Sequence, residues 1–158
     1  MTRQVEPFTT RSAFDAQLQM CFSRARLRLQ MFDPDFGQWG LGMREVDATL
    51  RRFLMGKGRI ELVAQDNAWL ERQCPRFLIL LRDFGPAIEC RVSGHNLRQL
   101  SDSFCIGDGR DIVRRFHSAY LRGEAVFDGP ADTELCAERF SGIWSESMPG
   151  LHASVTGL

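Results

Sequence analysis

Residues 101–116 hold the side chains whose types and spacing come closest to a reaction centre. Two hydroxyls, Ser101 and Ser103, precede a carboxylate, Asp108, in the stretch SDSFCIGDGRDIVRRF. A serine becomes a good nucleophile when an adjacent base removes its proton, and this stretch supplies no such base beside Ser101. The spacing therefore indicates where an active site could lie, but the base needed to activate a serine there is missing.

Cationic side chains surround the same stretch. Arginines lie at positions 98, 110, 114 and 115, followed by His117. Together they could bind phosphate or nucleic acid. Alternation along a strand sends Arg114 and Arg115 to opposite faces, so at most one of the two lines any given site. We keep Arg98, Arg110, Arg114, Arg115 and His117 as candidate anion-binding residues.

Three aspartates follow predicted strands. Asp33, Asp35 and Asp66 lie where open α/β sheets usually bind ligands, and carboxylates there could hold a divalent metal. Aspartates that cap helices or close turns are a commoner explanation of this placement. No glycine-rich phosphate loop, nucleophile elbow or cysteine–histidine metal spacing occurs in the sequence. We therefore expect neither a metal nor a cofactor.

Apolar periodicity predicts the elements that position these residues. Helical spacing indicates helices over about 10–24 and 43–55, then a helix from 66 or 67 that Pro75 kinks or restarts. Strands are expected over 26–32, 59–65 and 87–92, and this order favours right-handed crossovers onto a parallel sheet. Two strands, 104–107 and 112–116, then fold about an Asp-Gly turn at 108–111. Residues 117–129 are rich in turn formers, and a last helix covers about 130–146.

Length and composition suit one domain. The chain has 158 residues, of which 44% are hydrophobic and 25% charged, with equal numbers of acids and bases. We expect a domain over residues 10–147, a flexible leader over 1–9 and a flexible tail over 148–158. The five cysteines are odd in number and set in apolar segments, which indicates reduced core thiols. No apolar run is long enough for a signal sequence or a membrane span, so we expect a cytoplasmic protein without membrane contact.

The order of elements resembles one half of the phospholipase D superfamily fold. A parallel βαβαβ unit is followed by a hairpin and by a terminal helix of the form Phe140-x-x-x-Trp144. The resemblance implies a three-layer α/β sandwich with a mixed, mostly parallel sheet and a C-terminal hairpin. In that family a histidine on the strand entering the hairpin attacks phosphorus, a lysine follows two residues later, and an aspartate lies five residues beyond the lysine.

The resemblance places the family motif on this chain with two of its members changed. The family-like Asp108-Gly109 puts Ser103 at the lysine position and Ser101 at the histidine position. A serine at the lysine position supplies no cation for the charge that builds on phosphoryl oxygens. Small polar residues expected after the motif are replaced by the run Arg114-Arg115-Phe116. The resemblance therefore implies the fold of the family, together with a degenerate motif in which serines replace the histidine and the lysine.

Three functions remain open. The first is a non-catalytic structural or binding module. The second is a phosphodiesterase or nuclease with a histidine nucleophile. Either His95 acts together with Arg98, or His117 acts in a shifted motif. In the shifted motif Glu124 takes the aspartate position and Ala119 the lysine position. The third is an adaptor that binds anions or nucleic acid through the hairpin arginines. A homodimer is expected, because competent halves of the family assemble in pairs and a lone half leaves a sheet edge and an apolar helix face uncovered.

Overall fold

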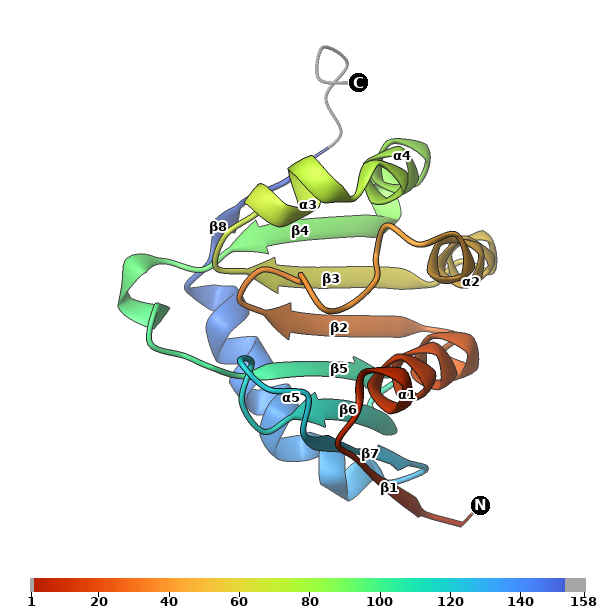
Figure 1. Cartoon of the computed structure of the whole chain (residues 1–158). Coiled ribbons are helices and arrows are strands. Elements are labelled where there is room, and N and C mark those ends of the chain that lie inside the picture. The colour runs from red at the N-terminus through yellow and green to blue at the C-terminus, as the bar shows by residue number, and fades with distance from the viewer. Residues whose placement is uncertain (1, 153–158) are drawn as a thin grey trace.

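The computed structural model describes residues 2–152 and shows one mixed sheet with helices on both faces (Figure 1). The strands are β1 (Gln4–Phe8), β2 (Arg28–Asp33), β3 (Arg59–Ala64), β4 (Ile88–Val92), β5 (Ser103–Gly107), β6 (Asp111–Arg115), β7 (Gly123–Phe127) and β8 (Met148–Pro149). The helices are α1 (Arg11–Arg24), α2 (Arg44–Met55), α3 (Ala68–Gln73), α4 (Pro75–Asp83) and α5 (Pro130–Ser145), with single 3-10 turns η1 (Gly85–Ala87) and η2 (His95–Leu97). The three-layer α/β sandwich predicted from the sequence is thus confirmed.

The strand order across the sheet is β1-β7-β6-β5-β2-β3-β4-β8. The pairs β2–β3 and β3–β4 are parallel, and the other pairs among the described strands are antiparallel. The expectation of a mostly parallel sheet is therefore wrong in this detail. The predicted βαβαβ unit is parallel, but the chain then crosses back through residues 93–102. It lays β5 beside β2 in the opposite direction, and β6, β7 and β1 extend the sheet by further antiparallel pairing.

Local sequence fixes the ends of the helices. The Thr10 hydroxyl accepts a hydrogen bond from the Ala13 amide and caps α1. The predicted interruption at Pro75 separates α3 from α4, and Pro75 takes the first position of α4, where its missing N–H costs nothing. The sheet therefore receives its crossover helices at the predicted places.

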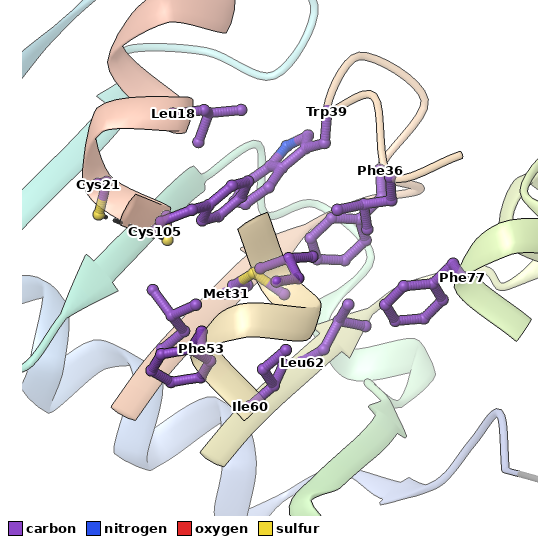
Figure 2. Close-up of a cluster of buried hydrophobic side chains, with 14 of the residues drawn as sticks. Leu18, Cys21, Met31, Phe36, Trp39, Phe53, Ile60, Leu62, Phe77 and Cys105 are labelled. Carbon is purple, nitrogen blue, oxygen red and sulfur yellow. Dashed lines mark hydrogen bonds between the residues drawn. The ribbon is translucent and has the colours of Figure 1, made fainter. Parts of the chain in front are cut away.

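The larger core lies between the sheet and helices α1, α2 and α4. Figure 2 shows its centre, where Met31, Ile60 and Leu62 of β2 and β3 meet aromatic side chains such as Trp39 and Phe53. The cysteines are free, with Cys136 half-buried and the other four buried, as expected of core thiols. This layer holds the N-terminal half of the chain against one face of the sheet.

The opposite face of the sheet is covered by α5. Phe140 of this helix packs edge-on against Phe104 of β5, with ring centroids 6.3 Å apart, and stacks on Trp144 at 5.7 Å. Helical spacing from Leu135 to Phe140 and Trp144 would predict an inward Leu135, but this side chain is 76% exposed. The inward stripe runs through Thr133, Phe140 and Ile143, and Leu135 lies outside it.

Both ends of the domain differ from the expected leader and tail. Within residues 1–9, strand β1 pairs with β7 at one edge of the sheet, although only Phe8 in it is buried. In the supposed tail, β8 pairs with β4 at the other edge, and residues 153–158 lie outside the described part of the chain. Strands this short, with one buried side chain or none, carry no apolar alternation to read.

The turn-rich segment 117–129 also contains a strand, β7, that the sequence analysis missed. Gly123 at its start indicated a turn, but a Cβ there would collide with the Arg114 carbonyl oxygen of the neighbouring strand. The glycine is therefore needed for close strand pairing. No helix within residues 2–152 has both the length and the apolar character that a bilayer span demands.

Candidate functional site

A buried polar centre lies on the α1 side of the sheet, where β2 ends and β5 begins. The Arg115 guanidinium donates from Nη2 to Asp33 Oδ1 at 2.6 Å and from Nε to Ser103 Oγ at 3.2 Å. The Arg115 and Asp33 side chains are only 2% and 1% exposed. The ring of Phe14 from α1 covers the guanidinium at 5.1 Å from its centroid. The position that the family motif assigns to lysine therefore contacts an arginine that is already neutralised.

Asp33 is held in place by its own loop. Its Oδ2 atom accepts hydrogen bonds from the amides of Phe36, at 2.7 Å, and Asp35, at 3.1 Å. The carboxylate thus joins the turn after β2 to the end of β6 through Arg115. A buried charge is tolerated only when it is paired and hydrogen-bonded in this manner.

Ser101 lies beside this centre at the mouth of a small hollow. The hollow has a volume of about 140 Å³ and is bordered by Ser101, Asp102, Arg114 and Cys136. Asp102 is bound by Arg139 at 2.6 Å, so it is not a free base beside Ser101. Burial raises the pKa of the Cys136 thiol, which keeps it protonated and weakly nucleophilic at neutral pH.

Asp108 lies at the opposite end of β5, in the hairpin turn. Asp108 and Gly109 both have positive φ, 55° and 64°, as a type I′ turn requires. The Asp108 carboxylate accepts hydrogen bonds from the backbone amides of residues 26, 27 and 28 at 2.8 to 2.9 Å. It therefore fixes the hairpin to the loop before β2, and the structure does not bring it to Ser101 or Ser103.

The two histidines proposed as nucleophiles are both exposed. His117 Nδ1 accepts the Ala119 amide at 3.0 Å, and its ring lies 5.6 Å from that of Tyr120. His95 opens the turn η2. Within residues 2–152 neither ring is hydrogen-bonded to an acidic side chain, the partner that would orient a nucleophilic histidine.

The candidate arginines of the hairpin do not form one patch. Arg110 lies at the turn, 3.5 Å from Asp111 and 3.6 Å from Asp128. Arg115 is buried, whereas Arg114 on the opposite face is partly exposed and pairs with Glu124 at 3.1 Å. Alternation along β6 accounts for this separation.

A second charged cluster holds the turn end of the hairpin. Arg24 binds Asp111 at 2.8 Å and Asp128 at 2.7 Å. Burial raises the pKa of Asp111, but the hydrogen bond from Arg24, the Asp128 amide and the charges of Arg24 and Arg110 together outweigh it, so the pKa falls below its ordinary value. Asp111 is therefore ionised at neutral pH, and the carboxylates of Asp111 and Asp128 pair with the guanidiniums of Arg24 and Arg110 at this end of the hairpin.

The other end of the hairpin carries an exposed surface that the sequence analysis did not identify as a unit. Phe116 is 50% exposed and lies under two guanidiniums, Arg114 at 5.1 Å and Arg122 at 5.9 Å from its centroid. Tyr120, 68% exposed, and His117 complete what we call the aromatic–arginine surface. The Ser118 amide donates to the Ser101 carbonyl at 2.8 Å, which ties this surface to the mouth of the hollow.

The remaining aspartates act as turn and cap residues. Asp35 accepts the Gly37 amide at 2.8 Å, and Asp66 accepts the Ala68 amide at 2.7 Å at the start of α3. Within residues 2–152 no three histidine, cysteine or acidic side chains gather in a way that would hold a metal ion. Asp33, the third member of this set, is bound to Arg115 instead.

Comparison with known proteins identifies the fold. A family model described as "Domain of unknown function (DUF7931)" matches residues 9–152. No curated protein matches the sequence. Among solved structures, the phospholipase D family member Nuc from Salmonella typhimurium is 16% identical with a TM-score of 0.69, over 97% of this chain and 99% of that one.

Two further structures have similar scores. NucT from Helicobacter pylori is 10% identical with a TM-score of 0.68, and the match covers 94% of this chain and 100% of that one. TrmBL2, an archaeal chromatin protein, is 11% identical with a TM-score of 0.69, over 93% of this chain and 54% of that one. The chain therefore has a phospholipase D-like fold, as the order of its elements predicts.

Proposed function

The chain belongs to the family described as a domain of unknown function, DUF7931, and we propose that it is a non-catalytic module with a phospholipase D-like fold. In this proposal the protein acts by binding or assembly. The residues at the place of the family's reaction centre stabilise the fold instead of catalysing a reaction.

The buried contact between Ser103, Arg115 and Asp33 carries this proposal. A lysine at position 103 would offer a free cation to phosphoryl oxygens. The residue here is a serine, and the nearest cation, Arg115, is paired with Asp33 at 2.6 Å and almost fully buried. A guanidinium whose charge is already neutralised inside the protein adds little stabilisation to a developing anion outside it.

The position assigned to histidine supports the same conclusion. Ser101 lacks a base to activate it, because the nearby Asp102 is bound to Arg139. The thiol at the hollow, Cys136, has a pKa that burial raises, so it is a weak nucleophile at neutral pH. These side chains line a space of only about 140 Å³, smaller than most ligand pockets.

Hydrolysis of bis(p-nitrophenyl) phosphate and of labelled single-stranded DNA tests the proposal. We expect no turnover above background by the purified protein, with and without divalent metal. The enzymatic alternative instead expects turnover that His95→Ala or His117→Ala abolishes. His152→Ala is the matched control, because this exposed histidine lies near the end of the described chain. Activity lost in one of the first two variants and kept in the control would disprove the non-catalytic proposal.

The aromatic–arginine surface favours a second candidate function, the binding of single-stranded nucleic acid. Exposed aromatic rings stack on bases, and neighbouring guanidiniums contact phosphates, without need of a particular sequence. Phe116 and Tyr120 supply exposed rings, and Arg122 is exposed and forms no salt bridge within residues 2–152. Among proteins of similar fold, TrmBL2 is described as binding DNA.

Fluorescence anisotropy of a labelled thymidine oligonucleotide tests this second function. Binding should weaken steeply with added salt. Phe116→Ala should reduce affinity by roughly 5-fold to 150-fold, the effect of about 1–3 kcal/mol per stacked base. Arg52→Ala on α2 is the matched control, since Arg52 is exposed and lies on the layer of α1 and α2. Absence of binding at low salt, or equal losses in both variants, would exclude this function.

We also propose that the protein is a homodimer. Competent halves of the phospholipase D superfamily work in pairs, and this chain has the length of one half. Strand β1 leaves one edge of the sheet open for pairing with a second copy. Sedimentation at micromolar concentration should give the mass of two chains, and a monomer would contradict the proposal.

A further inference from the structure

A second hollow lies at the edge of the sheet where β3 and β4 begin, opposite to the edge where β5 begins (Figure 1). Its volume is about 600 Å³, within the range of small-molecule pockets. The walls are mainly apolar and come from the ends of α2 and α4 and from η1. They are formed by Leu54, Met55, Phe84, Pro86 and Ala87.

Lys57 borders this hollow at a backbone position that usually belongs to glycine. The Lys57 amide donates to the Leu54 carbonyl at 3.0 Å, and the Gly58 amide donates to the Phe53 carbonyl at 3.1 Å. These two bonds form a Schellman helix end, in which the first residue beyond the C-cap is left-handed and is commonly glycine. Here Lys57 has a φ of +75°, although glycines occupy the positions before and after it. Residues held in this conformation cluster at functional sites, which marks the Lys57 side chain as a candidate ligand-binding group.

Arg59 brings a second cation to the same hollow. Its Nη1 atom donates to the Pro86 carbonyl at 3.2 Å, which holds the guanidinium beside the apolar wall. A guanidinium has five N–H donors, so this bond leaves others for a ligand. Arg28 is the neighbour of Arg59 in the parallel pairing of β2 with β3, and both residues are exposed. Like charges at neighbouring strand positions repel each other, so an anion bound at this edge relieves the repulsion.

The acidic side chain at the hollow does not neutralise these cations. Asp83 lines the hollow but is paired with Arg51 at 3.0 Å and with Arg82 at 3.3 Å. Neither Lys57 nor Arg59 forms a salt bridge within residues 2–152. The hollow therefore combines apolar walls with two cations that are free to attract an anion. A cationic ligand would be repelled there, and a neutral one would gain nothing from the two charges.

We propose that this hollow, which we call the Lys57 hollow, binds a soluble small molecule that joins an apolar body to one anionic group. The apolar body packs against Leu54, Phe84 and Pro86. The anionic group, a carboxylate, sulfonate or phosphate, lies at the rim beside Lys57 and Arg59. The site is at the opposite edge of the sheet from the family's reaction centre and from the aromatic–arginine surface, so this proposal and the proposed function can fail separately.

Phenylbutyrate is the probe for the experiment, because it joins an apolar body to one carboxylate. The chain has a single lysine, so reductive methylation with isotope-labelled formaldehyde gives one lysine NMR signal besides that of the α-amino group. The methylated amine keeps its positive charge. Phenylbutyrate should shift the Lys57 signal saturably, with a dissociation constant on the order of 1 mM for so small a ligand. Phenylbutyramide lacks the charge and acetate lacks the apolar body, and each should bind about tenfold or more weakly.

Variants connect the binding with the two cations. Arg59→Met should weaken phenylbutyrate binding about tenfold, whereas Arg72→Met, at an exposed arginine of α3, is its matched control. Lys57→Gly should also weaken binding, as saturation-transfer NMR of the ligand would show. Its urea midpoint should equal or exceed that of the wild type, because glycine fits the left-handed conformation, so loss of binding is kept apart from loss of folding. Phe116→Ala should bind phenylbutyrate as the wild type does, which separates this site from the aromatic–arginine surface.

Four outcomes would overturn the proposal. Three are a Lys57 signal that phenylbutyrate does not move, equal binding of the three probes, and equal affinity of Arg59→Met and Arg72→Met. The fourth concerns a membrane surface as the alternative source of apolar anions. Sedimentation with phosphatidylglycerol vesicles should leave the protein in the supernatant, and binding to vesicles without binding of phenylbutyrate would assign the Lys57 hollow to a membrane instead.

Discussion

Replacing Arg115 by methionine should strongly destabilise the protein. The variant removes the guanidinium that pairs with Asp33 and bonds to Ser103, while methionine fills similar volume. Asp33 keeps its bonds from the Phe36 and Asp35 amides but loses its counter-charge in a place that is 1% exposed. Removing one partner of a buried ion pair costs about 3–5 kcal/mol, because the remaining charge is uncompensated.

That cost is large against the total stability of a domain, about 5–15 kcal/mol. Asp33→Asn should cost a similar amount, because it leaves the Arg115 charge unpaired. The double variant Asp33→Asn with Arg115→Met removes both charges at once. Its loss of unfolding free energy should be about 2–3 kcal/mol smaller than the sum of the two single losses.

Urea unfolding followed by tryptophan fluorescence measures these values. Trp39 is a suitable reporter because its ring and the Arg115 guanidinium both contact Phe14, at 6.4 and 5.1 Å between centres. Arg114→Met is the matched control. Arg114 is the neighbour in β6, and its partly exposed pair with Glu124 should contribute at most about 1 kcal/mol. Equal stability of the two methionine variants, or strict additivity in the double variant, would refute the reasoning.

Three further measurements follow from the site. The pKa of Asp111 lies below its ordinary value of 3.8, because the hydrogen bonds from Arg24 and the Asp128 amide and the charges of Arg24 and Arg110 together outweigh the effect of burial. The stabilisation by Asp111 is therefore complete above that pH and is lost as the pH falls below it. Asp111→Asn should therefore lower the urea midpoint at about pH 7 and change it much less at about pH 2, whereas Asp15→Asn should have little effect at either pH. Burial raises the pKa of Cys90 to about 12, so iodoacetamide at neutral pH should label it only after unfolding, as mass spectrometry of the peptides would show. Asp108→Ala removes the acceptor of three backbone amides and should cost about 2–3 kcal/mol in urea unfolding, with Asp108→Asn losing less.

Sequence periodicity predicted the elements that bury a continuous apolar face. Alternation through Leu29 and Met31 located β2, and Phe14, Leu18 and Phe22 located α1, because these side chains are all buried in the core. The strands β1 and β7 were missed for different reasons. The first has one buried side chain at the edge of the sheet, and the second begins with a glycine required for close pairing.

The sequence predicted the strand on which the candidate site lies, but not which side chains contact one another there. The spacing of Ser101, Ser103 and Asp108 placed a candidate centre on the strand that enters the hairpin, and that strand is β5. The bond between Arg115 and Asp33 joins residues 82 positions apart and arises only when β2, β5 and β6 lie side by side. Sequence alone gave each of them a separate role, as an anion ligand and as a turn residue.

The aromatic–arginine surface could not be predicted from the sequence either, because it depends on contacts that form only when the chain folds. Phe116 and Arg122 lie on either side of a turn, and the contact between ring and guanidinium depends on how residues 116–122 fold back. The segment looked like an ordinary connection because its turn formers dominate its composition.

The hydrogen bonds of Asp108 bear on how an aspartate in this hairpin turn is interpreted in related sequences. A single carboxylate gathers three amides from the loop before β2 and so sets the angle at which the hairpin enters the sheet. The hairpin requires this carboxylate for its position whether or not the protein catalyses a reaction. An aspartate at this position therefore indicates the fold and does not by itself indicate catalysis. A motif search that counts it as one of three catalytic residues would overestimate how many proteins with this fold are enzymes.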